Sequence, residues 1–346
     1  MYKNGMAITD LASLSREIEL TEDEKEWRED KDGTLPLLIS DHIVAKLGIP
    51  AIRRQFVPSS AENIDRIGTM DPLEEVANSQ SDRLIHRYGN RVAFLVTDRC
   101  FAYCRHCFRR RFTGTMTGPC SISDIERAAR YIRENGILEV LLTGGDMFTL
   151  SDSMIDRMLS IFKSECPDAI LRLCTRAVAT NPGRFTDSLM EIIKKHQHGA
   201  PFYLMTQFNH PEELDDEATE AVRRFIDAGI PAMNQCVLLR GVNDSADVQI
   251  ELCNRLLRSR IKPYYLFQGD LVRGTAHLRV DIEKGLEIEM DMRKKLSGLA
   301  MPQYTIDLPE GGGKVILTHQ YLEGKDDGCW VFSTPSGEKR RYPVSK

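Results

Sequence analysis

VAFLVTDRCFAYCRHC, residues 92–107, is the stretch on which the fold assignment depends. Its first part, Val92–Thr97, is apolar and rich in β-branched residues, which predicts a buried strand. Cys100, Cys104 and Cys107 follow it with the spacing Cys-x3-Cys-x2-Cys. Three thiolates on one loop can ligate three irons of a [4Fe–4S] cluster and leave the fourth iron without a protein ligand. The stretch therefore predicts an iron–sulfur site directly after a strand.

A structural zinc ion is the alternative occupant of the same loop. It would use the three cysteines together with His106 or a remote side chain. Zinc sites usually combine two CxxC pairs, and the sequence has no second pair. The other six cysteines are scattered and are expected to be small buried side chains; they are Cys120, Cys166, Cys174, Cys236, Cys253 and Cys329. We therefore expect an iron–sulfur cluster.

The pattern of an apolar run, a polar end and a helical segment recurs after this first strand. The later runs are Leu138–Leu142, Ile170–Leu173, Phe202–Met205, Cys236–Leu239 and Tyr264–Phe267. Ser123 and Glu126 predict a capping box for a helix that ends near Gly136. Alternating strands and helices indicate parallel βαβ units. Six units favour an α/β fold, a partial (β/α)6 TIM-like barrel whose strand ends converge on one mouth. A doubly wound sheet is the alternative, but no GxGxxG follows the first strand.

The chain divides by pattern into three parts. Residues 1–90 are polar, charged and mostly helical in pattern, and they predict an N-terminal helical extension. Residues 91–300 form the predicted barrel. Residues 301–346 form a C-terminal segment and tail, with a short element around His319–Leu322 and Trp330–Ser333.

The composition fits a soluble globular protein, with 42% hydrophobic and 28% charged residues among 346. A net charge of -5 gives no general attraction to nucleic acid or to a membrane. No window holds about 18 consecutive apolar residues, as a membrane-spanning helix needs. The N-terminus lacks the apolar segment of a signal peptide. We expect a cytoplasmic protein.

Gly144-Gly145-Asp146 ends the second apolar run. Glycines let the backbone approach a ligand closely, and a carboxylate can bind an ammonium group. Taken alone, the triplet predicts only a tight turn between a strand and a helix. One βα unit after the cysteine loop, it indicates a binding segment for the ligand of the fourth iron.

Three further features bear on the substrate. Lys314 follows Gly311–Gly313, and a lysine amine can bind pyridoxal phosphate covalently, although a plain glycine turn would look the same. Arg109 lies in RHCFRRRF, residues 105–112, which could clamp a carboxylate or contact RNA in a zinc-dependent binding module. Asp270 and Asp307 are either caps or two carboxylates that select a cation at one barrel mouth.

Together these motifs resemble the lysine 2,3-aminomutase family of radical S-adenosylmethionine enzymes. The resemblance covers most of the chain. Besides the cysteine loop and the GGD triplet it includes LPLLIS at 35–40, HRYGNR at 86–91, FNHP at 208–211, NQCVLLRGVND at 234–244 and GGGK at 311–314.

The resemblance implies a role for each matching residue. Cys100, Cys104 and Cys107 ligate the cluster. The S-adenosylmethionine segment comprises Gly144, Gly145 and Asp146. Lys314 carries pyridoxal phosphate, and the positions around that cofactor are Arg87, Arg91 and Gln235. Arg109 holds the substrate α-carboxylate, while the remote amine is gripped by Asp270 and Asp307.

The resemblance also implies the reaction, that of an isomerase. A 5′-deoxyadenosyl radical abstracts hydrogen from the substrate Cβ, and the amino group then migrates from Cα to Cβ. The family further implies an electron donor of the flavodoxin or ferredoxin type and a homo-oligomeric enzyme. No nucleic-acid or membrane partner is expected.

The sequence departs from the family at several positions. Ser245 follows RGVND and the C-terminus has only Cys329, so we expect no C-terminal zinc site. Glu310 precedes the glycine run, and Gln207 replaces a histidine. The shorter tail also occurs in relatives that modify a translation elongation factor, which remains an alternative role.

The two aspartates favour a cationic substrate. They argue against glutamate, whose remote carboxylate they would repel. L-Lysine is the expected substrate, with β-lysine as its product. Arginine and ornithine stay open as alternatives because both end in a cation.

Overall fold

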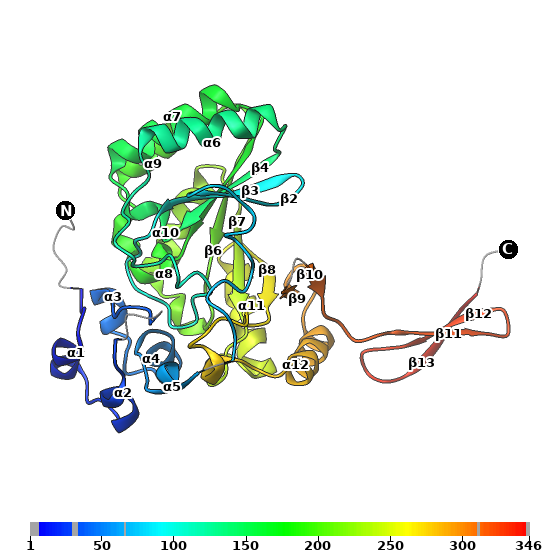
Figure 1. Cartoon of the computed structure of the whole chain (residues 1–346). Helices are drawn as coiled ribbons and strands as arrows, with labels where there is room; N and C mark the ends of the chain where they lie inside the picture. Colours follow the sequence, from blue (N-terminus) through cyan, green and yellow to red (C-terminus); the bar gives the residue numbers. More distant parts are fainter. Residues whose placement is uncertain (1–6, 30–33, 66, 310–311, 344–346) are drawn as a thin grey trace.

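The computed structural model describes residues 7–29, 34–65, 67–309 and 312–343. In this part of the chain, one sheet holds strands β1 to β10 in sequence order, and β3 to β9 run parallel (Figure 1). The first five strands are β1 (Ser79–Ser81), β2 (Leu84–Tyr88), β3 (Arg91–Thr97), β4 (Glu139–Gly144) and β5 (Ile170–Thr175). The others are β6 (Phe202–Thr206), β7 (Ala232–Val237), β8 (Ile261–Phe267), β9 (Gln303–Leu308) and β10 (Gly313–Ile316). The predicted parallel α/β fold is confirmed.

The helices that connect the parallel strands pack against one another around the sheet, α6 on α7, α7 on α9 and α11 on α12. They are α6 (Ile122–Glu134), α7 (Asp152–Glu165), α8 (Ala177–Thr180), α9 (Asp187–Lys195), α10 (Asp216–Asp227), α11 (Ala246–Arg258) and α12 (Ile282–Lys295). Short 3-10 turns interrupt the connections at η1 (Met147–Thr149), η2 (Pro182–Arg184), η3 (Pro211–Glu213) and η4 (Ala276–Leu278). On β5, Leu171 and Leu173 are buried in the core under these helices, whereas Arg172 and Cys174 alternate to the other face. One face of the sheet is thus left to line the barrel interior.

The strand predicted at Cys236–Leu239 is wrong in its position, because β7 begins four residues earlier, at Ala232. Polar Asn234 interrupts the apolar pattern there. Its side chain is fully satisfied inside the sheet, since Oδ1 accepts from the Thr206 hydroxyl at 3.0 Å and from the Phe208 N–H at 2.7 Å. A polar residue that finds buried partners can occupy a strand that sequence periodicity does not reveal.

The capping box predicted at Ser123 and Glu126 is also wrong. The N-cap of α6 is Ser121, whose side chain accepts from the Asp124 N–H, while Asp124 accepts from the Ser121 N–H. The predicted pair, Ser123 and Glu126, has the same spacing as the observed pair, Ser121 and Asp124. Just before Ser121, the Cys120 N–H donates to the Val96 carbonyl at 2.8 Å. With this tertiary bond in place, the helix begins two residues earlier in the chain than predicted.

The N-terminal extension is helical only up to Ile64. Its helices are α1 (Leu11–Glu17), α2 (Glu22–Glu26), α3 (Asp41–Val44), α4 (Pro50–Phe56) and α5 (Ala61–Ile64). The later part of the predicted 1–90 segment instead forms β1 and β2, and β2 pairs antiparallel with β3. A separate apolar cluster that includes Leu14, Ile39 and Phe56 packs against Ala102 of the cysteine loop. The extension is therefore a support for that loop.

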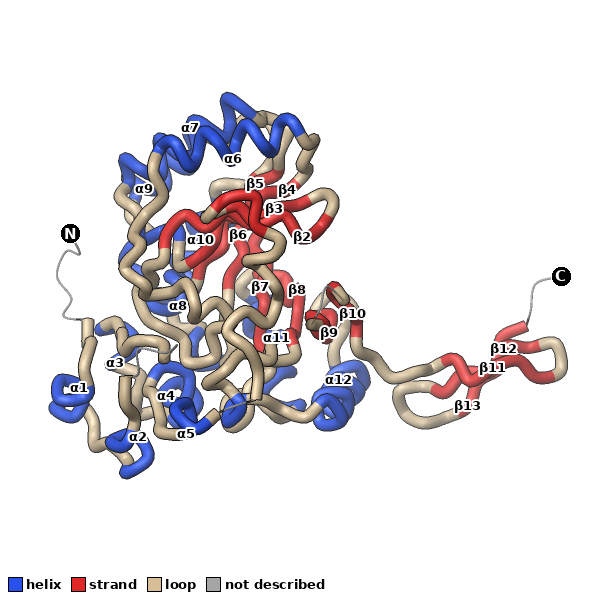
Figure 2. Tube along the Cα trace, in the orientation of Figure 1, coloured by secondary structure: helices blue, strands red, loops and turns tan. Residues whose placement is uncertain are grey.

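The C-terminal part forms two structures. β9 and β10, from the predicted 301–346 segment, complete the edge of the main sheet. A three-stranded antiparallel sheet of β11 (Leu322–Asp326), β12 (Cys329–Ser333) and β13 (Lys339–Pro343) stands away from the body (Figures 1 and 2). β12 contains the predicted Trp330–Ser333 segment. In the described ranges, no helix is long and apolar enough to cross a membrane.

Candidate active site

The cysteine loop leaves β3 at the carboxyl end of the sheet, where barrel active sites lie. Cys100, Cys104 and Cys107 are half-buried. Burial raises the pKa of Cys100, and the neighbouring charges of Asp146, Cys107 and Cys104 raise it further. Within the described ranges, no three metal-binding side chains converge as the ligands of a single ion would. A [4Fe–4S] cluster needs a more widely spaced set of ligands than a single ion does, because each thiolate binds a different iron.

The N-terminal extension fixes the cysteine loop through Arg105. This side chain is fully buried and forms a two-point ion pair with Glu62, at 2.8 and 2.6 Å. It also donates to the carbonyls of Leu35 and Pro36, which begin the LPLLIS segment. Tyr103 N–H donates to the Leu38 carbonyl at 2.8 Å. The conformation of the loop thus depends on residues 43 to 70 positions before Arg105.

Two buried donors beside the cysteines indicate what the site binds. His106 Nδ1 and Arg176 Nε are buried and have no hydrogen-bond partner among the described residues. A buried donor without an acceptor costs about 1–3 kcal/mol. An anionic cluster with a carboxylate-bearing cosubstrate would supply acceptors at this place, so the residues present fit such a group.

Gly144 and Gly145 allow two backbones to meet. The Gly145 N–H donates to the Thr97 carbonyl at 2.6 Å, and the Asp146 N–H donates to the Arg99 carbonyl at 2.7 Å. A Cβ on Gly145 would lie 2.1 Å from the Arg99 oxygen. The glycines therefore let the end of β4 lock onto the chain that leads into Cys100. Their predicted contact with S-adenosylmethionine stays a prediction.

The Asp146 carboxylate is hydrogen-bonded to other groups of the protein. Its carboxylate accepts from the Phe148, Arg176 and Ala177 N–H groups and from the Thr175 hydroxyl, at 2.8 to 3.0 Å. Burial raises the pKa of Asp146, although these hydrogen bonds oppose the rise. The side chain ties the end of β4 to the end of β5. Its predicted contact with an ammonium group stays a prediction, and the structure gives it a positioning role.

Arg109 is paired with an acidic residue that sequence reasoning missed. Its Nε lies 3.1 and 3.0 Å from the two oxygens of Glu75, and Nη2 donates to Oε1 at 2.5 Å. Nη1 donates to the Thr143 hydroxyl at 3.1 Å, and Arg111 binds the other Glu75 oxygen. Glu75 precedes β1 in a polar stretch whose pattern gave no signal of burial. Glu75 thus fixes the direction of the Arg109 guanidinium, and the predicted contact of Arg109 with a substrate carboxylate stays a prediction.

Asp307 and Lys314 lie opposite each other on β9 and β10, and their side chains form an ion pair. Asp307 Oδ1 accepts from Arg87 Nη1 at 3.0 Å and from the Tyr88 hydroxyl at 2.9 Å. Arg91 stacks on the Tyr88 ring at 3.9 Å. The structure thus brings a predicted substrate residue into contact with two predicted cofactor residues.

The surroundings of Lys314 fit pyridoxal phosphate. The side chain is 27% exposed, and its amine lies 4.8 Å from the centre of the Phe267 ring. Guanidinium groups such as those of Arg87 and Arg91 bind phosphate well, and the predicted contact of these two residues with the cofactor stays a prediction. Gln235 lies on β7, paired with Tyr265 of β8. Glu310 and Gly311, part of the predicted glycine segment, lie outside the described residues.

Asp270 follows β8 and faces the same group of charges. Burial raises the pKa of Asp270 to about 7, and the nearby Asp307 carboxylate adds to the rise. Lys314 and Arg87 oppose it, while Glu75 adds to it. A bound cation would lower this pKa, so the carboxyl group favours a positively charged ligand.

The chain is similar to several known proteins. A family profile described as "Radical SAM superfamily" matches residues 94–250. The L-lysine 2,3-aminomutase of Bacillus subtilis is 36% identical over 339 residues, which cover 96% of this chain and 71% of that protein. The glutamate 2,3-aminomutase of Clostridioides difficile is 38% identical over 336 residues, 96% of this chain and 79% of that protein. The chain belongs to the lysine 2,3-aminomutase family of radical S-adenosylmethionine enzymes.

Membership of the aminomutase family makes the chain an isomerase that uses a [4Fe–4S] cluster and S-adenosylmethionine. A putative L-lysine 2,3-aminomutase of Aquifex aeolicus is 35% identical over 348 residues, 98% of this chain and 93% of that protein. A solved radical SAM methyltransferase of Sphaerobacter thermophilus is 18% identical over 65% of this chain and 68% of that chain, with a TM-score of 0.44.

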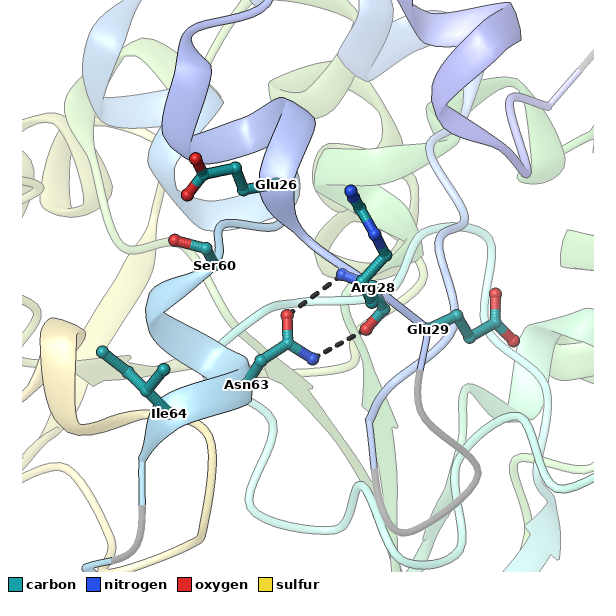
Figure 3. A pocket seen from close by; sticks show the side chains of 6 residues that line it. All are labelled: Glu26, Arg28, Glu29, Ser60, Asn63 and Ile64. Carbon is teal, nitrogen blue, oxygen red and sulfur yellow. Dashed lines mark hydrogen bonds between the residues drawn. The ribbon is translucent and has the colours of Figure 1, made fainter.

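A surface hollow of about 570 Å³ is lined by residues of the N-terminal extension (Figure 3). Its lining residues are Glu26, Arg28, Glu29, Ser60, Asn63 and Ile64. Asn63 accepts from the Arg28 N–H at 3.0 Å and donates to the Arg28 carbonyl at 2.7 Å, which joins α5 to the chain after α2. No residue predicted for the aminomutase reaction lines this hollow, and we assign it to the packing of the N-terminal helices.

Replacing Gly145 with alanine should prevent the cysteine loop from closing on β4. The added Cβ meets a backbone oxygen that cannot move without breaking the loop, and such overpacking costs about 1–3 kcal/mol or more. We expect G145A to bind less iron and sulfide after anaerobic reconstitution. Gly298→Ala is the matched control, since nothing lies within 4 Å of its Cβ. Full cluster loading in G145A would contradict this role of the glycine.

The raised pKa of Asp270 predicts a pH dependence. Only the ionised carboxylate attracts a cation, so kcat/KM for a cationic substrate should rise with pH through about 7 and then level off. Asp270→Asn should remove this limb and lower kcat/KM by roughly ten- to a hundredfold, the value of a charge-assisted hydrogen bond. A pH profile of D270N with the limb intact would assign the titration to another group.

Proposed function

We propose that this chain is a 2,3-aminomutase that converts L-lysine to β-lysine. The observation that carries the substrate choice is the pair of carboxylates, Asp270 and Asp307, beside Lys314. They attract the remote ammonium of lysine, whereas they repel the second carboxylate of glutamate. The relatives include enzymes named for lysine and for glutamate, and the acidic pair favours lysine.

The cofactors would be held by residues from different elements. Cys100, Cys104 and Cys107 would hold the cluster, and Lys314 would hold pyridoxal phosphate with Arg87, Arg91 and Gln235 around its phosphate. When bound, these groups and S-adenosylmethionine supply a 5′-deoxyadenosyl radical and a conjugated ring that delocalises an unpaired electron. The contribution of the chain is to hold the reacting atoms in one fixed arrangement.

Lys314 and Asp307 are coupled by their ion pair. A lysine amine that binds an aldehyde covalently no longer provides the ammonium that Asp307 holds. Once the substrate amine replaced Lys314 on the aldehyde, the released lysine amine would have to move off its Asp307 oxygen before that oxygen could bind the remote ammonium of the substrate. Arg87 and Tyr88 keep their bonds to the other oxygen and preserve the orientation of the carboxylate.

Arg109 would hold the opposite end of the substrate. Glu75 and Thr143 fix the plane of its guanidinium, which leaves the remaining N–H groups of the fork for the α-carboxylate. A cation-binding end and a carboxylate-binding end together orient a basic amino acid so that its Cα and Cβ face the cofactors. The same arrangement would accept ornithine or arginine if the distance between the two ends matched.

Three further features belong to the same proposal. The electron that first reduces the cluster would come from a donor of the flavodoxin or ferredoxin type, and it returns to the cluster whenever S-adenosylmethionine is regenerated. The enzyme would work as a homo-oligomer, as the family resemblance implies, and in the cytoplasm. The product would be either a free metabolite or a group transferred to a translation elongation factor.

The test is an anaerobic turnover assay on the reconstituted protein with S-adenosylmethionine and dithionite. Lysine, ornithine, arginine and glutamate are supplied separately, with and without pyridoxal phosphate, and products are compared with β-amino standards by mass spectrometry. We expect β-lysine as the dominant product, and only with pyridoxal phosphate present. Preferred turnover of glutamate would overturn the substrate assignment, and full turnover without pyridoxal phosphate would overturn the role of Lys314.

A further inference from the structure

Arg176 joins the end of β5 to one of the cysteine ligands. It is the residue directly after β5, and only 8% of it is exposed. Its Nη1 donates to the Cys104 sulfur at 2.7 Å. For comparison, the sulfur of a second cysteine ligand, Cys107, lies 3.7 Å from the neutral Thr113 hydroxyl. The contact at Cys104 is therefore both shorter and charged.

Besides its contact with Cys104, the Arg176 guanidinium is held by two separate segments, α4 and η3. Nη2 donates to Glu213 Oε1 and to Gln55 Oε1, each at 2.5 Å. Its central carbon lies 4.7 Å from the centre of the Phe56 ring. Gln55 and Phe56 belong to α4, and Glu213 belongs to η3. With the backbone N–H of Arg176 also bound to Asp146, the group cannot turn away from Cys104 without breaking several buried bonds.

Glu213 is the counter-charge of Arg176. It is fully buried, and its second oxygen accepts from the N–H groups of Asn209 and His210 at 2.6 and 2.8 Å. Gln55 Oε1 accepts in addition from Asn209 Nδ2 at 3.0 Å. The FNHP segment therefore fixes the carboxylate, and the carboxylate fixes the arginine. The ion pair is buried beside a ligand sulfur, where charges interact more strongly than in water.

We propose that Arg176 is a positioning residue that sets the reduction potential of the cluster through Cys104, with Glu213 as the opposing charge. The inference rests on the assignment of the three cysteines as cluster ligands. Hydrogen bonds to the ligand sulfurs and the net charge around a cluster are two of the features that set its potential. A cationic donor on a thiolate sulfur stabilises the reduced form, and a buried carboxylate destabilises it.

The step concerned is a one-electron reduction. The oxidised cluster takes one electron from an external low-potential donor and gains one negative charge. No bond forms or breaks at Arg176, and no proton moves. The arginine lowers the energy of the added charge, so the electron is accepted at a less negative potential than it would be without the arginine.

The experiment is a redox titration of the reconstituted full-length protein, followed by the EPR signal of the reduced cluster with dithionite as reductant. Arg176→Met should make reduction at least tenfold less favourable, a shift of about 59 mV to more negative potential. Arg176→Lys keeps the charge and should recover part of that shift. Glu213→Gln should move the potential in the opposite direction, because it removes the opposing charge.

Two further variants keep the test decisive. Gln55→Glu adds a carboxylate beside an intact Arg176 and should shift the potential to more negative values, even if R176M loads too little iron to be titrated. Arg184→Met removes an arginine that binds the carbonyls of Phe148 and Leu150 and should leave the potential unchanged.

Each outcome has a distinct meaning. Opposite shifts for the Arg176 and Glu213 variants, at full iron and sulfide content, support a charge effect on the cluster. Shifts in the same direction, or wild-type potentials in E213Q and Q55E, would overturn the proposal and leave a structural role for Arg176. Wild-type protein that bound no iron–sulfur cluster would instead refute the ligand assignment.

Discussion

The close approach of two backbones at the carboxyl end of the sheet is the constraint on which the rest of the site depends. Gly145 and Asp146 donate their N–H groups to the carbonyls of Thr97 and Arg99, and this contact sets where the cysteine loop begins. The Asp146 carboxylate then caps the start of the next loop at Arg176, which in turn reaches Cys104. Three neighbouring strand ends are thus joined by short bonds, and each positions a group that the chemistry needs.

The charges around the mouth are balanced in pairs. Glu75 neutralises Arg109, Asp307 pairs with Lys314, and Glu213 pairs with Arg176. In the described part of the chain Asp270 forms no such ion pair, and burial raises its pKa to about 7. The other charges named here are paired, and burial destabilises the ionised form of Asp270. A bound cation would stabilise that form, so the site favours a positively charged ligand. Substrate choice therefore follows from the arrangement of the pairs as much as from any one residue.

Sequence reasoning found the features whose signals are local. Apolar runs with polar ends predicted most of the parallel strands, and the cysteine spacing predicted the cluster loop. Sequence reasoning failed where a partner far away in the sequence determines the place of a residue. Asn234 sits in β7 because Thr206 and Phe208 satisfy it, and Glu75 and Arg176 became visible only when folding placed them on Arg109 and Cys104. In a polar stretch, the sequence pattern does not show which acidic residue forms a buried ion pair.

We propose that one mouth holds radical chemistry and a cation-selective amino-acid site together. Freeze-quenched EPR of the complete anaerobic reaction tests it most directly, with L-lysine deuterated at Cα or Cβ. We expect an organic radical during turnover whose line width changes with deuterium in lysine, and no such radical with L-glutamate. A substrate radical from glutamate but not from lysine, or a signal insensitive to the deuterium label, would contradict it.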